Sequence, residues 1–239
     1  MTPQDLLRLS FAAVITLSLL IGCTHTAPTG SPGDYFAGWP AGFSPQEIGK
    51  RVAERYLASP YGGFGRTQPV NHIPYPETCT WYGGLTFAGL TRDTDLGNQL
   101  VNRFGPLFAE RRDLLPVPDH VDYTVFAAVP LEIFIRTKVM PYLTLGLEMA
   151  DKQWGEPFGP RANEESWAYY RKGLTWQTRM WIDDMFMITA VQAQAYRATG
   201  ERKYIDRAAR EMVVYLDSLQ QPNGLFYHAP DVPFFWGRG

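Results

Sequence analysis

Runs of like charge are missing from this 239-residue chain, whose 22 basic and 24 acidic side chains give a formal net charge of −2. Nucleic acid or the anionic face of a membrane would be met by a basic patch, so we expect no nucleic-acid partner. The sequence also lacks the residue spacings of zinc, calcium, phosphate-loop and dinucleotide sites. We therefore predict that the chain uses no metal and no cofactor.

The N-terminal apolar run, residues 6–21, is too short and wrongly flanked for a membrane-spanning helix. It ends in Leu20-Ile21-Gly22-Cys23, which resembles a bacterial lipobox and implies cleavage before Cys23 and lipidation of its thiol. We predict a lipoprotein signal peptide over 1–22, a Thr-, Pro- and Gly-rich tether over 23–43 and a folded domain over 44–239. The protein would then sit in a bacterial cell envelope and touch the membrane through its lipid anchor alone.

Cysteine is scarce, since Cys79 is the only thiol of the folded part once Cys23 carries a lipid. No internal disulfide is then available, even in an oxidising compartment. A small buried core residue is the simplest interpretation of Cys79.

Strand alternation is absent from residue 44 onward, where the apolar positions follow helical spacing. Ser44 as N-cap, Pro45 at the first helical position and Glu47 at the third predict the start of a helix. Helices are predicted over 44–59, 80–91, 93–109, 121–137, 142–153, 178–199 and 201–219.

Two kinds of helix alternate along the chain. The 201–219 helix has one apolar face and one charged face, which is typical of an outer helix. The 121–137 and 178–199 helices are apolar nearly all round, which indicates inner helices. This alternation predicts an all-α toroid of helical hairpins, in which the inner helices run parallel and present their N-termini at one mouth.

Asp183 and Asp184 are the only acidic or basic residues between Met180 and Tyr196. An ionised carboxylate in an apolar setting costs several kcal/mol unless it is paired, so such acids usually have a role. With Thr178 as N-cap, Asp183 would fall past the first turn and capping would explain it poorly. Asp184 could instead be a satisfied core acid, and periodicity does not decide which of the two faces a cavity.

Several residues near the starts of the inner helices are further candidates for the mouth. Asp122 could alternatively cap its own helix, and His228 lies in a loop that leads to the mouth. Trp81 and Tyr82 could be core aromatics, and Arg238 could be a solvated tail residue. The candidate site residues are therefore Tyr82, Asp122, Trp181, Asp183, His228, Trp236 and Arg238.

Three motifs together resemble a known family. They are Trp181-x-Asp183-Asp184-Met185-Phe186-Met187, Asn223-Gly224-Leu225-Phe226-Tyr227-His228 and Trp236-Gly237-Arg238-Gly239. They resemble the unsaturated rhamnogalacturonyl and glucuronyl hydrolases of glycoside hydrolase family 105, over residues 44–239. The resemblance implies an (α/α)6 barrel that removes an uronic acid with a C4=C5 double bond from the non-reducing end of lyase-generated oligosaccharides.

The resemblance also implies roles for single residues. Asp183 matches the general acid and base, and Asp122 matches the second catalytic acid. Trp181, His228, Trp236 and Arg238 match positions of the substrate pocket. The family often has a basic residue shortly before its Trp-x-Asp motif; Lys172 is the nearest candidate, but Gly173 has the expected spacing, so that role stays open.

Seven predicted helices fall short of the twelve of an (α/α)6 barrel, so we expect an incomplete toroid, cut short at its C-terminus. Two alternatives remain beside the hydrolase. One is a glycan-binding lipoprotein or inactive fragment that keeps the aromatic pocket without catalysis. The other is an ordinary glycosidase that acts on saturated oligosaccharides. The sequence carries no prediction of oligomeric state.

Overall fold

The computed structural model describes residues 38–63 and 69–230. The chain divides into two units, 1–45 and 46–239. Cys23, Trp236 and Arg238 lie outside the described residues, so their predicted roles stay predictions. Within the described ranges the regular secondary structure is helical, and Gln220 and Phe226 form an isolated bridge. The predicted all-α class is confirmed.

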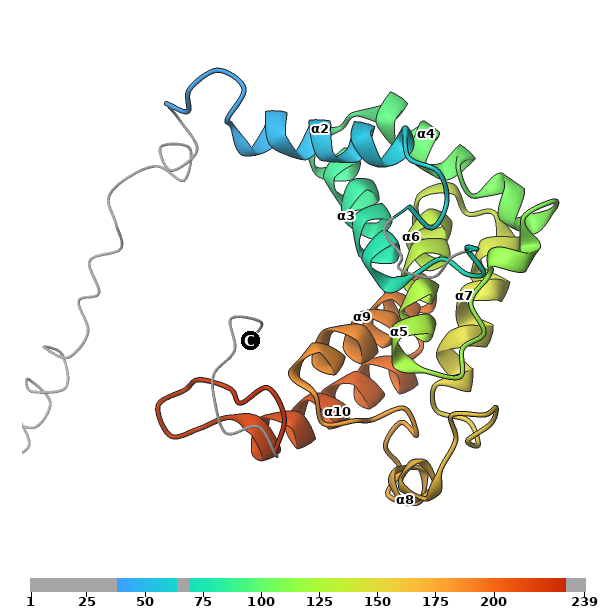
Figure 1. Cartoon of the computed structure of the whole chain (residues 1–239), viewed down its shortest axis with the longest axis vertical. Coiled ribbons are helices and arrows are strands. Elements are labelled where there is room, and N and C mark those ends of the chain that lie inside the picture. Colours follow the sequence, from blue (N-terminus) through green and yellow to red (C-terminus); the bar gives the residue numbers. More distant parts are fainter. Residues whose placement is uncertain (1–37, 64–68, 231–239) are drawn as a thin grey trace, which may run out of the picture. The chain divides into compact units, whose positions relative to one another are not determined.

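The helices, labelled in Figure 1, follow the chain in order. They are α2 (Pro45–Leu57), α3 (Tyr75–Thr91), α4 (Thr94–Asn102), α5 (Val121–Thr124), α6 (Ala128–Thr137), α7 (Met140–Lys152), α8 (Glu164–Arg171), α9 (Ile182–Thr199) and α10 (Arg202–Leu219). Short 3-10 turns cover Gly105–Phe108, Arg112–Leu114 and Val125–Ala127.

Four predicted helices need correction. The 80–91 helix begins earlier, at Tyr75. The 93–109 helix ends at Asn102 and continues as 3-10 turns, and the 121–137 helix is divided into α5, a 3-10 turn and α6. The 178–199 helix begins at Ile182 rather than at residue 178, because Met180 has a left-handed backbone with φ 55°. The sequence prediction missed α8, which has only eight residues and too few turns to show a helical period.

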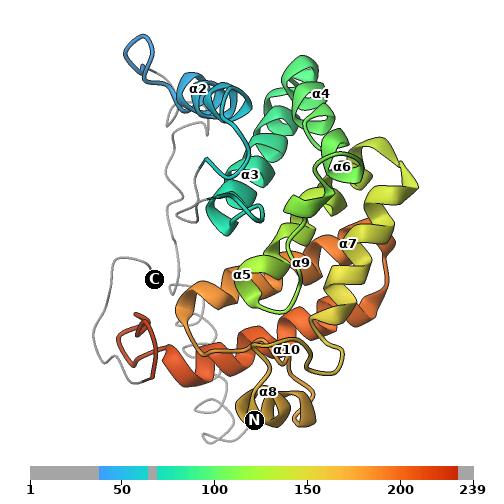
Figure 2. The same ribbon diagram turned by 45° about the vertical axis from the view of Figure 1, so that its right-hand side comes forward.

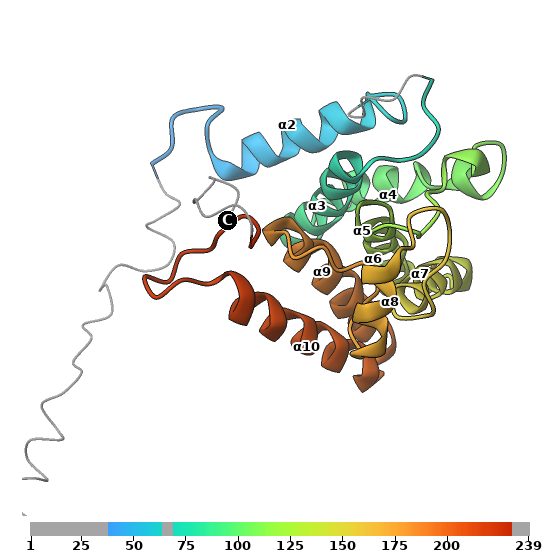
Figure 3. The same ribbon diagram turned by 60° about the horizontal axis from the view of Figure 1, so that its bottom comes forward.

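Consecutive helices pair as hairpins, α3 with α4, α6 with α7 and α9 with α10. The first helix of each hairpin also contacts its counterpart in the next, so that α6 lies between α3 and α9 (Figures 2 and 3). Helix α6 is buried from Ala128 to Phe134, whereas α10 buries one face only. This series of inner and outer helices is the predicted toroid arrangement.

The core forms two clusters. The larger joins α3, α4, α6, α7 and α9, and Trp81 lies at its centre, fully buried, with its indole N–H donating to the Leu100 carbonyl at 3.0 Å. Gly146 lets α7 approach α6 closely, since a Cβ there would lie 2.5 Å from Leu131 Cγ. The smaller cluster, which includes Val121, joins α5, α9 and α10. Across the described part of the chain, no helix is long and apolar enough to cross a bilayer.

Candidate active site

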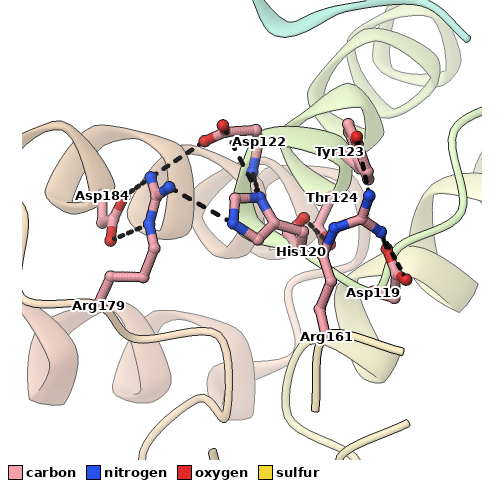
Figure 4. Close-up of polar contacts among 8 residues, drawn as sticks. All are labelled: Asp119, His120, Asp122, Tyr123, Thr124, Arg161, Arg179 and Asp184. Carbon is pink, nitrogen blue, oxygen red and sulfur yellow. Dashed lines mark hydrogen bonds and ion pairs between the residues drawn. The ribbon is translucent and has the colours of Figure 1, made fainter. Parts of the chain in front are cut away.

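The guanidinium of Arg179 joins two carboxylates at the N-terminal ends of α5 and α9 (Figure 4). Its Nη2 lies 3.1 Å from Asp122 Oδ1 and 2.5 Å from Asp184 Oδ1, and its Nε lies 3.1 Å from Asp184 Oδ2. Asp184 has no exposed surface, whereas the Asp122 side chain is 26% exposed. The ion pair therefore runs from the buried core to a solvent-facing acid.

His120 fixes the start of α5. It is the N-cap residue, and its Nδ1 accepts a hydrogen bond from the backbone N–H of Asp122 at 3.2 Å. Its Nε2 lies 3.4 Å from Nη1 of Arg179. The suggestion that Asp122 caps its own helix is wrong, because Asp122 is the second residue of α5 and the imidazole serves as the cap.

A second arginine anchors the segment before α5. Arg161 Nη1 lies 2.8 Å from both carboxylate oxygens of Asp119, and its Nη2 donates to the Tyr123 hydroxyl at 3.1 Å (Figure 4). The ring of His72, which precedes α3, packs on Tyr123 with centroids 4.6 Å apart. The N-terminal ends of α3, α5 and α9 are thus linked through direct contacts, as the toroid prediction required.

Trp181 and His228 meet at the start of α9. Their ring centroids are 5.4 Å apart, and the backbone N–H of Ile182 donates to the His228 carbonyl at 2.9 Å. The Trp181 ring is 43% exposed and has Arg179 over its face at 5.0 Å. Trp181 and Asp122 therefore contact one guanidinium, and His228 packs against Trp181, although the three residues lie far apart in the sequence.

The two acids of α9 differ in their surroundings. Both lie in the first turn, because the N-cap is Trp181 and the prediction of Thr178 as N-cap is wrong. Negative charge is favoured at this end of a helix, so the structure gives Asp183 a capping explanation that the sequence had made weak. Asp184 is the buried, paired acid and Asp183 is half-buried. Of the pair, Asp183 is therefore the acid nearer to solvent.

The segment from Leu174 to Met180 carries Arg179 and is held by buried hydrogen bonds. Gln177 donates to the Pro118 carbonyl at 2.8 Å, and the indole N–H of Trp176 donates to the Lys152 carbonyl at 2.8 Å. From α10, Glu211 accepts bonds from the Thr178 hydroxyl and from the Thr175 backbone N–H. This short loop is thus as firmly packed as a core element.

The electrostatics follow from burial. Burial raises the pKa of Asp184, and the hydrogen bonds from Arg179 and Tyr215 offset only part of this effect. Burial also raises the pKa of Glu211 to about 7, helped by the nearby charge of Asp184. Burial lowers the pKa of His120, against the attraction of Asp122 and in the same direction as the charge of Arg179. A neutral imidazole therefore lies beside the charged guanidinium.

A cavity of about 310 Å³ opens beside these residues. Its lining includes His120 and Arg179, which contact Asp122, together with Arg161, Gln177 and residues at the start of α8. The residues that line it among those described do not include Asp122, Asp183 or Trp181, so the cavity lies on the Arg161 side of the cluster.

Two candidates lie apart from this cluster. Tyr82, two turns into α3, lines a separate apolar hollow with Phe186 and residues of α9 and α10. Lys172 lies over the ring of Tyr169 at 5.5 Å. The basic residue beside the acids is Arg179, which sequence reasoning missed. Its position two residues before Trp181 was the available signal.

Comparison with known proteins agrees with the fold. The family model described as Glycosyl Hydrolase Family 88 matches residues 48–238. This match covers most of the chain, so the chain belongs to this family of glycoside hydrolases, and its all-α hairpin fold is consistent with that class. No curated protein and no solved structure matches the chain.

Proposed function

We propose that the protein is an unsaturated uronyl hydrolase of the kind found in glycoside hydrolase family 105. It would act on oligosaccharides that polysaccharide lyases leave with a C4=C5 unsaturated uronic acid at the non-reducing end. The single observation that carries the proposal is the Arg179 ion pair, because it ties Asp122 to the start of α9, where Asp183 lies beside Trp181.

The proposed reaction is hydration of the double bond. Asp183 gives its proton to C4, water adds its oxygen at C5, and the Asp183 carboxylate takes the proton that this water loses. The resulting hemiketal opens to a ketone at C5, which leaves a hemiacetal at C1 that expels the next sugar. Bond breaking at the anomeric carbon is thus a consequence of hydration and not a displacement, so the carboxylate separation rule of other glycosidases does not apply.

The other residues have supporting roles in this proposal. Asp122 is the second acid and carries negative charge beside Arg179. The exposed face of Trp181 stacks on the sugar ring, and His228 orients that indole. Trp236 and Arg238 complete the pocket, and the Arg238 guanidinium pairs with the substrate carboxylate. Lipidated Cys23 anchors the protein to the cell envelope.

The ultraviolet absorbance of the conjugated double bond tests the proposal. Wild-type protein added to a lyase digest should abolish the absorbance, and Asp183→Asn should slow the decay by about 100-fold or more. Asp206→Asn is the matched control, because Asp206 is an exposed acid on α10 that pairs with Arg202. Persistent absorbance with wild type, or equal decay with Asp183→Asn, rejects the assignment. Calorimetric binding of an unsaturated disaccharide without decay would favour a glycan-binding protein.

A further inference from the structure

Arg179 contacts more of the candidate site than any single acid does. Its guanidinium reaches Asp122 and His120 at the start of α5, Asp184 in α9 and the face of the Trp181 ring. These groups come from two inner helices and the loop between α8 and α9.

We propose that Arg179 is a positioning residue of the active site, which holds the Asp122 carboxylate and the Trp181 ring in register. This inference rests on the proposed function for its catalytic readout. Arg179 acts through Asp122 and Trp181 and does not itself bind substrate, because its charge is already shared by two carboxylates.

The geometry separates this role from an ordinary buried ion pair. Asp184 engages Nε and Nη2, which would satisfy a simple pair. The guanidinium nevertheless also directs Nη2 to the solvent-facing Asp122. A planar fork with several N–H donors can bind both carboxylates in this arrangement, whereas a lysine ammonium lacks the planar geometry. An arginine at position 179 is therefore required by the solvent-facing Asp122 as well as by the buried Asp184.

The anchor of Arg179 lies behind it, on α10. The buried Tyr215 hydroxyl donates to Asp184 Oδ2 at 3.3 Å. Met180, the residue with φ 55° that follows Arg179, packs in the same core cluster as Tyr215. Tyr215 and Asp184 thus hold Arg179, and Arg179 holds Asp122.

Three variants and one control test the proposal. Arg179→Met removes the bridge but leaves Asp184 buried without its cation, so it can fail to fold. The double variant Arg179→Met/Asp184→Asn removes both charges and keeps the core neutral. Arg179→Lys keeps the charge without the planar fork. Arg197→Met is the control, because Arg197 pairs with the buried Glu132 near the other end of α9, roughly 27 Å along an 18-residue helix.

We expect the double variant to unfold cooperatively and to lose about 10- to 100-fold in kcat with KM changed less than about threefold. Arg197→Met should keep its kcat within about twofold. Retention of wild-type kcat in a folded double variant overturns the proposal. If the double variant does not fold, Arg179→Lys decides: a kcat loss of about fivefold or more supports positioning, and wild-type kcat overturns it.

A wild-type protein that leaves the double bond intact would reject the proposed function, and a second readout then decides the role of Arg179. The imidazole proton resonance of His120 can be followed against pH, since the chain has four histidines and His120→Gln assigns the signal. Arg179 and Arg161 lower the pKa of His120, while Asp122 and Asp119 raise it. Arg179→Met/Asp184→Asn should raise that pKa and Arg197→Met should not. An unchanged His120 titration overturns the inference.

Discussion

The two ends of α9 each pair an arginine with a buried carboxylate, yet they differ in what else the arginine meets. At the C-terminal end, Arg197 bonds to Glu132 at 2.9 Å and to the Gln194 side chain, and half of its own side chain is exposed. At the N-terminal end, Arg179 is 27% exposed and is shared by Asp184 and Asp122. The Arg197 pair links the C-terminal end of α9 to α6, whereas Arg179 connects the buried Asp184 to the solvent-facing Asp122.

Removing the carboxylate from each pair should lower the free energy of unfolding by different amounts at the two ends of α9. Asp184→Ala is expected to lower the free energy of unfolding by about 3–5 kcal/mol, because it leaves Arg179 largely buried beside one remaining acid. Glu132→Ala should cost only about 1–2 kcal/mol, since Arg197 can turn toward water. Urea denaturation of both variants measures the difference. Equal losses would mean that the two pairs are equivalent.

Glu211, the buried acid of α10 that binds the loop before α9, should also make the stability of the protein depend on pH. Glu211 has a pKa of about 7 in the folded protein, raised chiefly by burial. The folded protein holds this proton more tightly than the unfolded chain, so the stability that Glu211 contributes is fully present below about pH 4.5 and is lost as pH rises through about 7. The loss is about 3 kcal/mol for a shift of this size, and the raised pKa of Asp184 acts in the same direction.

Two variants change this pH dependence in opposite directions. Glu211→Gln should flatten the fall of stability between pH 4.5 and 7. Thr178→Val should steepen it, because the Thr178 hydroxyl bond lowers the Glu211 pKa. Thermal unfolding across this pH window measures both slopes. A wild-type protein that gains stability from pH 4.5 to 7 would contradict the predicted effect of the buried acid.

The sequence predicted the helical class and the alternation of inner and outer helices because burial follows periodicity, and periodicity is a local property. It could not predict the start of α9, since local periodicity does not mark the left-handed backbone at Met180, which packs in a core cluster with the distant Tyr215. It also did not identify the ion pairs of Arg179, because a position two residues before Trp181 places this arginine near the acids without showing which carboxylates the fold brings to it. Its partners Asp122 and Asp184 lie 57 and 5 residues away.

The candidate site was predicted in part. Asp122, Trp181 and His228 do gather near the acids of α9, as the parallel inner helices required. Which acid is buried could not be read from the sequence, since Asp183 and Asp184 differ only by one position on the helix. The packing of α10 against α9 makes that choice, because Tyr215 lies behind Asp184.

Two tyrosine hydroxyls bonded to carboxylates, one buried pair and one partly exposed pair, should show a smaller difference in stability. Tyr215→Phe should lower stability by about 1–2 kcal/mol, because the hydroxyl and its Asp184 partner are both buried. Tyr204→Phe should cost about 0.5 kcal/mol, since the Asp151 side chain that it meets at 3.2 Å is 45% exposed and can bind water instead. Denaturant midpoints at constant m-value distinguish the two. A larger loss for Tyr204→Phe would contradict the role of burial.

The exposed pair Arg202 and Asp206, in the first turns of α10, should contribute least to the stability of the protein. Both side chains are more than half exposed, and their closest atoms are 3.3 Å apart. Asp206→Asn should change the unfolding free energy by less than about 0.5 kcal/mol, because solvent and salt screen such pairs. The same ion-pair chemistry is thus expected to span an order of magnitude in stability between this surface pair and Arg179–Asp184. A loss above about 1 kcal/mol in Asp206→Asn would show that desolvation does not account for the difference.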